Sequence, residues 1–398
     1  MPARVEYEVR GQVPRERAGA CYSVEIARSH DEVETALRCA EILDEASAFQ
    51  HRMWLTTWFA TAGRHASVRP LVASIRDKAR DQLAMLLPLV ELRQKGRSIV
   101  EFADLGVTDY NAPLLGPAAP RCADSAKRLW TALTRELPTV DAIRLSKMPG
   151  EVGSLRNPLT LLPSSQESHL HGNVLNVSTF EDFKRARGRA HRKECERSWR
   201  VFERLGGTQF RRTRDVGEAL RILRSIEEQQ RRRITGLGLP YLLDAPHIAG
   251  FYRKLVSDGL AGGYAVVTAL LAGEETVAAL LGIRNGDSFT ILRIGNAGEA
   301  WKPCSPGRLV IARTIELLCG EGCTSFDFTT GDYEFKRRLG AERGRLFELT
   351  EARSWWGVPI AAKAAVKGRL LRYPNLANKV RRFLQRDAAG PGLMMART

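Results

Sequence analysis

The sequence of 398 residues lacks several features that mark whole classes of proteins. Its seven cysteines are scattered along the chain instead of clustered, so we expect reduced thiols and no disulfide framework. No apolar run approaches the roughly 18 residues that a membrane-spanning helix needs, and residues 1–6 contain no apolar core of the kind found in a signal peptide. We therefore predict a cytoplasmic protein.

Acidic residues are also scarce relative to basic ones. The chain has 61 Lys and Arg against 45 Asp and Glu, a net charge of +16, and such a field favours anionic partners. CoA, a nucleic acid, an anionic lipid surface and an acidic polysaccharide precursor all fit, and composition does not choose among them. With 44% apolar and 7% aromatic residues, the composition is that of an ordinary globular protein, and the length suggests two units.

Local patterns divide the chain into four parts. A polar, Arg/Glu-rich lead-in covers residues 1–22, and a first domain covers residues 23–165. Residues 161–172, rich in Ser, Leu and His, are the best candidate for a linker, which places the boundary near residue 165. A second domain then covers residues 166–354, and a basic, amphipathic tail covers residues 355–398.

Both halves combine helical and strand periodicity, which predicts an α/β (α+β) fold without a convincing internal sequence repeat. Asn285-Gly286-Asp287 predicts a tight hairpin between two strands. The expected helices cover residues 29–43, 53–59, 124–136, 179–183, 189–205, 216–234, 246–260 and 307–319. The expected strands cover residues 68–75, 83–92, 98–102, 141–145, 264–271, 276–284, 288–295 and 325–328.

The loop Ser305-Pro306-Gly307-Arg308 between a strand and a helix has the chemistry of a phosphate site. A helix N-terminus offers unpaired N–H groups and the positive end of the helix dipole. Gly307 lets the backbone approach an anion, Pro306 presets the first turn, and Arg308 adds a charged donor. The alternative interpretation is an ordinary helix start without a ligand.

The order of motifs around this loop resembles one bacterial branch of the GNAT superfamily. Ser305-Pro306-Gly307 is followed by Phe326-Asp327-Phe328, Gly331-Asp332 and Phe335-Lys336-Arg337-Arg338. That branch contains the CelD-like acetyltransferases of cellulose biosynthesis and is related to the Fem-type aminoacyl transferases. Supporting matches in the first half, within a resemblance covering residues 45–345, are Phe49-Gln50, Trp54, Trp58, Leu86-Leu87-Pro88-Leu89 and Thr108-Asp109-Tyr110-Asn111.

The resemblance implies tandem GNAT-like domains, each a mixed, mostly antiparallel sheet flanked by helices. The second would keep the acyl-CoA site, with its pantetheine arm along residues 292–295 up to Gly295, and the first would help to form the acceptor cleft. Cofactor-binding residues would be Gly295, Ser305, Pro306, Gly307, Arg308, Lys336 and Arg337. Acceptor-cleft residues would be Asp109, Tyr110 and Asn111.

Catalysis by direct attack of an amine on a thioester needs a base and a proton donor. Asp327 or Asp332 could act as the base, although Asp327 could instead pair with Arg337, and Asp332 could simply form a turn. The branch commonly has Tyr where this chain has Phe335, so that hydroxyl is absent. Tyr333, two residues earlier, could replace it, or could simply pack.

Other clusters are weaker as sites. His169 and His171 lack a third metal ligand nearby, and Cys319 and Cys323 lack a second pair, so we predict no metal. The basic runs at residues 185–200 and 231–233 lack interleaved aromatic residues, so solvated helix faces are favoured over a nucleic-acid site. They would nevertheless suit an aminoacyl-tRNA donor.

These observations predict an acetyl-CoA- or other acyl-CoA-dependent N-acyltransferase acting on an amine or hydroxyl of a small molecule or glycan precursor. The resemblance alone suggests exopolysaccharide, cellulose or envelope biosynthesis. Two alternatives remain: a tRNA-dependent, Fem-like transferase, and a non-catalytic accessory protein of a polysaccharide synthase. The basic tail could attach such a protein to the synthase complex or to the inner membrane surface.

Overall fold

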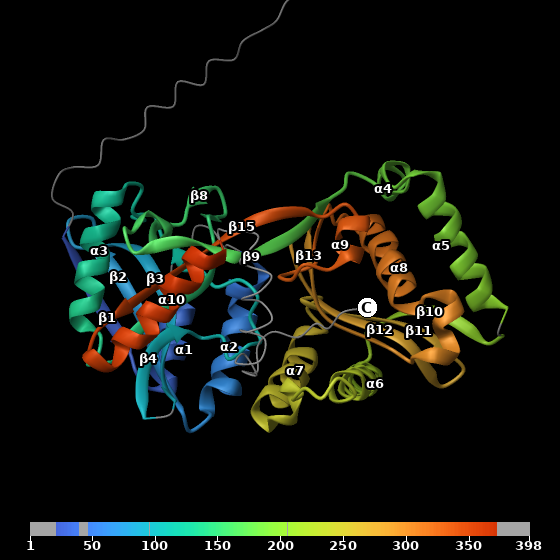
Figure 1. The fold of residues 1–398 in the computed structure, drawn as a ribbon, viewed down its shortest axis with the longest axis horizontal. Coiled ribbons are helices and arrows are strands. Elements are labelled where there is room, and N and C mark those ends of the chain that lie inside the picture. Colours follow the sequence, from blue (N-terminus) through green and yellow to red (C-terminus); the bar gives the residue numbers. More distant parts are fainter. Residues whose placement is uncertain (1–20, 40–46, 95, 205, 372–398) are drawn as a thin grey trace, which may run out of the picture.

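One sheet of 13 strands runs through both halves of the molecule (Figure 1). The structure is a computed structural model, and it describes residues 21–39, 47–94, 96–204 and 206–371. The strand order is β1-β2-β3-β4-β6-β15-β9-β14-β13-β12-β11-β10, with β5 beside β3. No helix in these ranges is long and apolar enough to cross a bilayer.

The bounds of the elements are as follows. The strands are β1 Tyr22–Ala27, β2 Val68–Asp77, β3 Gln82–Gln94, β4 Arg97–Phe102, β5 Leu114–Leu115, β6 Ala142–Pro149, β7 Glu151–Val152, β8 Leu155–Arg156, β9 Ser165–Asn176, β10 Thr208–Thr213, β11 Ala265–Ala272, β12 Glu275–Asn285, β13 Ser288–Asn296, β14 Ser325–Asp327 and β15 Glu342–Ala352. The α-helices are α1 His30–Cys39, α2 Arg52–Ala60, α3 Ala123–Glu136, α4 Phe180–Ala186, α5 Gly188–Glu203, α6 Val216–Thr235, α7 Pro246–Gly259, α8 Pro306–Gly320, α9 Glu334–Arg338 and α10 Val358–Leu371.

The two halves repeat one topology. The N-terminal unit (β1 to β6) and the C-terminal unit (β10 to β14) each run strand, two helices, three main strands, helix, strand. In each unit the strands before and after the last helix are parallel, β4 to β6 and β13 to β14, and the other neighbours within the unit are antiparallel. The predicted fold class, a mixed and mostly antiparallel sheet flanked by helices in each half, is confirmed.

Helices cover both faces of the sheet in the C-terminal unit. On one face α6 and α7 bury Ile226 and Leu255, and on the other α8 and α5 bury Val310 and Phe202. Helix α7 also packs against α2 of the N-terminal unit, where the Phe251 and Trp54 rings meet edge to face at 4.8 Å. The first of these cores therefore spans both halves.

Two strands join the units, and the sequence interpretation missed both. The expected linker at residues 161–172 is wrong from residue 165 onward, because β9 begins there and pairs with β14 and β15. Strand β15 lies between β6 and β9 (Figure 1). A strand that follows the C-terminal unit in the sequence therefore extends the sheet of the N-terminal unit. Strand β9 buries Ser168, Gly172 and Asn173, so it shows no apolar alternation.

The end of the predicted lead-in and the start of the predicted tail also differ from the expectation. Strand β1 begins at Tyr22, within the expected lead-in, and pairs along β2. Helix α10 lies against β6, β9 and β15, and the short turn before it exposes Trp355 and Trp356. The apolar residues predicted for an amphipathic tail at Leu376, Val380 and Leu384 lie outside the described residues.

Candidate functional site

Strands β13 and β14 separate after a short parallel contact. They pair only at Ser288↔Ser325, Phe289↔Phe326 and Thr290↔Asp327. A register shift against β12 leaves Leu292 opposite no residue, and such a bulge bends a strand. From residue 291 to 296, β13 has no strand beside it on the β14 side within the described ranges. This edge offers backbone groups to an extended ligand containing amides.

Helix α8 begins next to this edge. Ser305 has a left-handed conformation (φ 48°, ψ 59°), and Pro306 is the first helical residue. A Cβ built on Gly307 would first meet Asn296 Nδ2, at 3.5 Å, so the backbone there is open to approach. The first turn contains no acidic residue and no side-chain cap. The four residues predicted to hold phosphate therefore form one helix start with the electrostatics that an anion needs.

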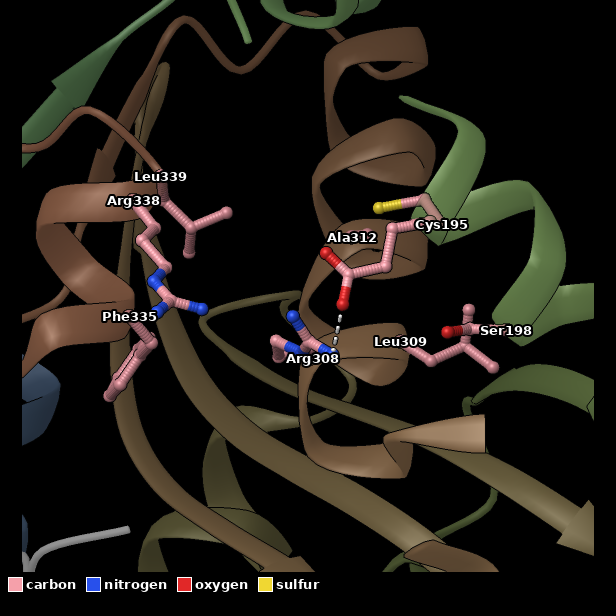
Figure 2. A pocket seen from close by; sticks show the side chains of 9 residues that line it. Cys195, Ser198, Arg308, Leu309, Ala312, Phe335, Arg338 and Leu339 are labelled. Carbon is pink, nitrogen blue, oxygen red and sulfur yellow. Dashed lines mark ion pairs between the residues drawn. The ribbon is translucent and has the colours of Figure 1, made fainter. Parts of the chain in front are cut away.

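Arg308 already has partners at this helix start. Its guanidinium donates to Ser305 Oγ at 2.8 Å and pairs with Glu194 Oε1 of α5 at 2.7 Å. Figure 2 shows this ion pair, whose two residues line a small cavity of about 40 Å³. An anion at α8 would therefore compete with Glu194 for Arg308.

Phe335, which stands where the branch resembled in sequence commonly has tyrosine, lines the same cavity. Phe335 and Leu339 of α9 face Leu309 and Ala312 of α8, with Cys195 of α5 opposite (Figure 2). Burial raises the pKa of the Cys195 thiol, so the thiol is a poor nucleophile. The cavity therefore offers packing surface and no proton donor at position 335.

A buried hydrogen bond joins the two halves beside the end of β14. The Tyr110 hydroxyl donates to Asp327 Oδ1 at 2.8 Å, and the Thr329 N–H donates to the same oxygen at 2.6 Å. Burial raises the pKa of Asp327 to about 7, although both hydrogen bonds act in the opposite direction. Burial and the adjacent Asp327 raise the pKa of Tyr110 well above its usual value. Asp327 is thus a carboxyl group poised to exchange a proton near neutral pH.

Two further predicted residues meet at this junction. Asp109 Oδ1 accepts a hydrogen bond from the Thr330 hydroxyl. The Lys336 ammonium is buried and donates to the carbonyls of Thr330 at 2.7 Å and Thr329 at 3.2 Å. Burial lowers the pKa of Lys336 to about 8, while Asp109 and Asp327 act in the opposite direction. In this position Lys336 holds the loop after β14.

The other predicted residues lie apart from this junction or have structural partners. Asn111 donates to Asp104 Oδ2 at 3.0 Å and to the Ser146 carbonyl at 3.1 Å, which holds its loop within the N-terminal unit. Asp332 is exposed and pairs with Arg343 at 2.8 Å and with Arg337 at 3.9 Å. These charges form a surface cluster that favours the turn-building interpretation of Asp332.

Tyr333 packs against an aromatic ring and is influenced by charges of both signs. Its ring stacks on Phe335 with centroids 6.0 Å apart. Burial raises the pKa of Tyr333 to about 12, with Arg233 opposing and Asp109 reinforcing the rise. The hydroxyl therefore stays protonated at neutral pH and could donate a proton.

The sequence interpretation missed Arg293, although it is the one charged residue among the apolar positions of β13. Its Nη2 donates to Tyr241 Oη at 3.0 Å and to Gln230, and its guanidinium lies 5.1 Å from the centre of the Tyr252 ring. A charge inside an apolar strand was the signal that could have identified Arg293.

Gly295, predicted to bind cofactor, lies under α6, because a Cβ there would come within 2.9 Å of Ile226 Cα.

Comparisons with known proteins agree with this geometry. The GNAT acetyltransferase domain family matches residues 189–337. FemX shares the fold with a TM-score of 0.53 at 10% identity, over 82% of this chain and 96% of FemX. L-PGS from Bacillus licheniformis has a TM-score of 0.49 at 14% identity, over 86% of this chain and 97% of its own. No curated protein matches the chain in sequence.

The GNAT match begins at α5 and ends in α9, so it includes the separated strands β13 and β14 and the helix start at Gly307. The fold shared with FemX extends through both halves. Residues 189–337 thus match the GNAT acetyltransferase domain family, and the chain as a whole shares the fold of FemX.

Proposed function

We propose that the chain is an acyl-CoA-dependent N-acyltransferase whose donor site lies in the C-terminal unit. The observation that carries this proposal is the open helix start at Gly307 next to the unpaired edge of β13. A pyrophosphate at the α8 N-terminus would leave the pantetheine arm to run along that edge, where its amides would pair with backbone groups.

The thioester would then lie near Leu292, and the acceptor amine would approach from the junction of the two halves. The proposed base is Asp327, which takes a proton from the ammonium before attack. The nitrogen adds to the thioester carbonyl, and a β13 N–H stabilises the oxyanion. The carbon–sulfur bond then breaks, the nitrogen releases its second proton to water as the amide forms, and the CoA thiolate takes a proton from Tyr333. Water returns that proton from Asp327 to Tyr333.

Calorimetric titration of the full-length protein with acetyl-CoA and longer acyl-CoAs tests the donor site. Gly307→Asp places a carboxylate at the second residue of α8, and the Cβ has room there. We expect wild-type binding and a loss of about 100-fold or more in the variant, because the carboxylate repels the pyrophosphate.

The matched control is Asp124→Asn at the second residue of α3, which should leave acyl-CoA binding unchanged. Circular dichroism would verify that both variants fold. Absence of binding to every acyl-CoA by folded wild-type protein would overturn the proposal, as would equal binding by Gly307→Asp.

A second candidate is transfer from an aminoacyl-tRNA, which the Fem-type resemblance implies. The fold shared with FemX and the exposed basic side chains of α5 at Arg189, Arg192, Lys193, Arg197 and Arg200 favour it. Filter binding with tRNA over a range of salt concentrations would test it, because phosphate contacts produce a steep salt dependence. Tight, salt-dependent tRNA binding without acyl-CoA binding would replace the first proposal with this one.

The acceptor and the pathway stay predictions from the sequence. A glycan precursor in exopolysaccharide, cellulose or envelope synthesis rests on the family resemblance alone. Attachment of the tail to a membrane surface or a synthase complex also stays a prediction from the sequence. The same is true of a non-catalytic accessory role.

A further inference from the structure

Three consecutive arginines near the end of α6 have different surroundings. Arg231 pairs with Asp244, and Arg232 lies 4.0 Å from Glu228 with its side chain 81% exposed. Arg233 has neither an ion pair nor a hydrogen bond within the part of the chain that the structure describes, and its Nε is shielded from solvent. A partly buried guanidinium without a partner is costly, so its retention needs a reason.

A second guanidinium lies close to Arg233. Arg293 on β13 also has no carboxylate partner among the described residues, and its Nε is likewise buried without an acceptor. The like charge of Arg293 helps to lower the pKa of Arg233, after the larger effect of burial. Gln230, which accepts a hydrogen bond from Arg293, lies three residues before Arg233 on α6. Glu227 acts electrostatically on Arg293, whereas no carboxylate among the described residues shifts the pKa of Arg233.

This pair adjoins the junction where the amine is proposed to react. Arg233 and Asp109 both act electrostatically on Tyr333, in opposite directions. Asp109 in turn acts on Asp327 and Lys336. The carboxyl groups suit an ammonium, whereas the two guanidinium groups suit an anion, and groups of both kinds act on Tyr333.

We propose that Arg233 and Arg293 form a subsite for an anionic group, a carboxylate or phosphate, carried by the acceptor amine. The guanidinium of Arg293 is held by Tyr241 and Gln230, whereas Arg233 has its fork free to bind two oxygens. This inference rests on the proposed function, because it assigns the substrate class of the same site.

The first test measures the subsite without turnover. The full-length protein is treated with phenylglyoxal, with and without inorganic phosphate, and modification of individual arginines is followed by peptide mass spectrometry. We expect phosphate to slow the modification of Arg233 and Arg293 several-fold and to leave Arg232 unaffected. Equal modification of Arg233 and Arg232 at every phosphate concentration would overturn the proposal.

The second test uses matched acceptors with acetyl-CoA as donor and detection of the released thiol. O-phosphoethanolamine is compared with ethanolamine, and β-alanine with propylamine, which also separates phosphate from carboxylate recognition. We expect at least a tenfold preference in kcat/KM for one anionic amine, since removing a partner from a buried charged pair costs at least that much. Arg233→Gln should abolish this preference, and Arg232→Gln, the same charge change on the same helix, should keep it.

The outcomes separate the two proposals. Phosphate protection of Arg233 without any acyl-CoA binding supports the subsite and overturns the acyl-CoA function. Acyl transfer at equal rates to anionic and neutral amines, or an undiminished preference in Arg233→Gln, overturns the subsite and keeps the function. Unchanged acetyl-CoA affinity in Arg233→Gln would show that the substitution acts on the acceptor and not on the donor.

Discussion

The two units share a topology but begin their last helices with opposite chemistry. Helix α3 of the N-terminal unit has Asp124 as its second residue, and α8 of the C-terminal unit has Gly307 there. A carboxylate at that position uses the helix dipole itself, whereas a glycine leaves the dipole and the N–H groups to a ligand. The topology is therefore repeated. The first turn of the last helix, in α3 or in α8, is what distinguishes the unit that suits an anion from the unit that does not.

The loops that follow the parallel strands differ in the same way. In the N-terminal unit the partly buried Lys147 pairs with Asp104 at 2.7 Å and donates to the Thr108 carbonyl at 2.6 Å. Burial is the largest single effect and opposes the charge of Lys147, but Asp104, Asp109 and Glu101 together outweigh it and raise the pKa of Lys147. In the C-terminal unit Lys336 donates only to carbonyls, and its pKa falls. One unit pairs its lysine directly with a carboxylate, and in the other the nearby carboxylates only partly offset the burial of Lys336 beside the proposed reaction site.

Replacing each lysine with methionine should give the largest difference between the units. Lys147→Met leaves the Asp104 carboxylate buried without its cation, which costs about 3–5 kcal/mol of unfolding free energy. Lys336→Met leaves two carbonyls without a donor and removes an unpaired buried charge, so we expect a loss of about 1–2 kcal/mol. Urea unfolding measures the loss of unfolding free energy in each variant. Equal losses would contradict the expected difference between the two units.

The carboxyl group at the end of β14 should give a smaller, pH-dependent effect. The folded pKa of Asp327 is about 7, above its reference value of 3.8, so the folded state binds the proton more tightly. This group's stabilisation is complete below pH 3.8 and is lost as the pH rises toward 7. As the pH rises from 4 to 8, the unfolding free energy of Asp327→Asn should therefore increase relative to that of wild type, by on the order of 2 kcal/mol.

Urea unfolding of Asp327→Asn and wild type at both pH values measures this gain. Thr330→Ala serves as a control, because it removes a neighbouring hydroxyl and no titrating group. A stability difference between Asp327→Asn and wild type that stays constant with pH would show that Asp327 is ionised in the folded state across this range.

The smallest effect should come from the helix start of the N-terminal unit. Asp124→Asn removes a negative charge from the first turn of α3, which costs about 0.3–1 kcal/mol at low salt. High salt should reduce that cost by screening. Thermal unfolding at two salt concentrations measures it, and a salt-independent loss would indicate a lost hydrogen bond instead of a lost dipole interaction.

Elements with strong local periodicity were predictable from the sequence. Helices α2, α3 and α6 to α8 and strands β2 to β4 and β11 to β13 lie within a few residues of their expected positions. The hairpin at Gly286 forms as expected, with a φ of 60° that suits glycine. The start of α8 was also predictable, because proline and glycine act on their own backbone.

Strands β1, β10 and β15 were not predicted, and β9 was taken for a linker. Each gains its hydrogen bonds from a strand that is distant in sequence or carries polar side chains on its buried face. Local composition does not record such pairing, since strand propensity depends on the neighbours that the fold supplies.

The sequence by itself therefore determined which segments become helices, which turns are tight and which helix start suits an anion, because these depend on neighbouring residues. Only the tertiary structure decided that Tyr110 meets Asp327, 217 positions apart. The tertiary structure also decided that Arg231 and Arg232 have ion-pair partners, whereas Arg233 has none among the described residues. The physical reason is that proton affinity and charge compensation depend on burial and on groups brought together from both halves.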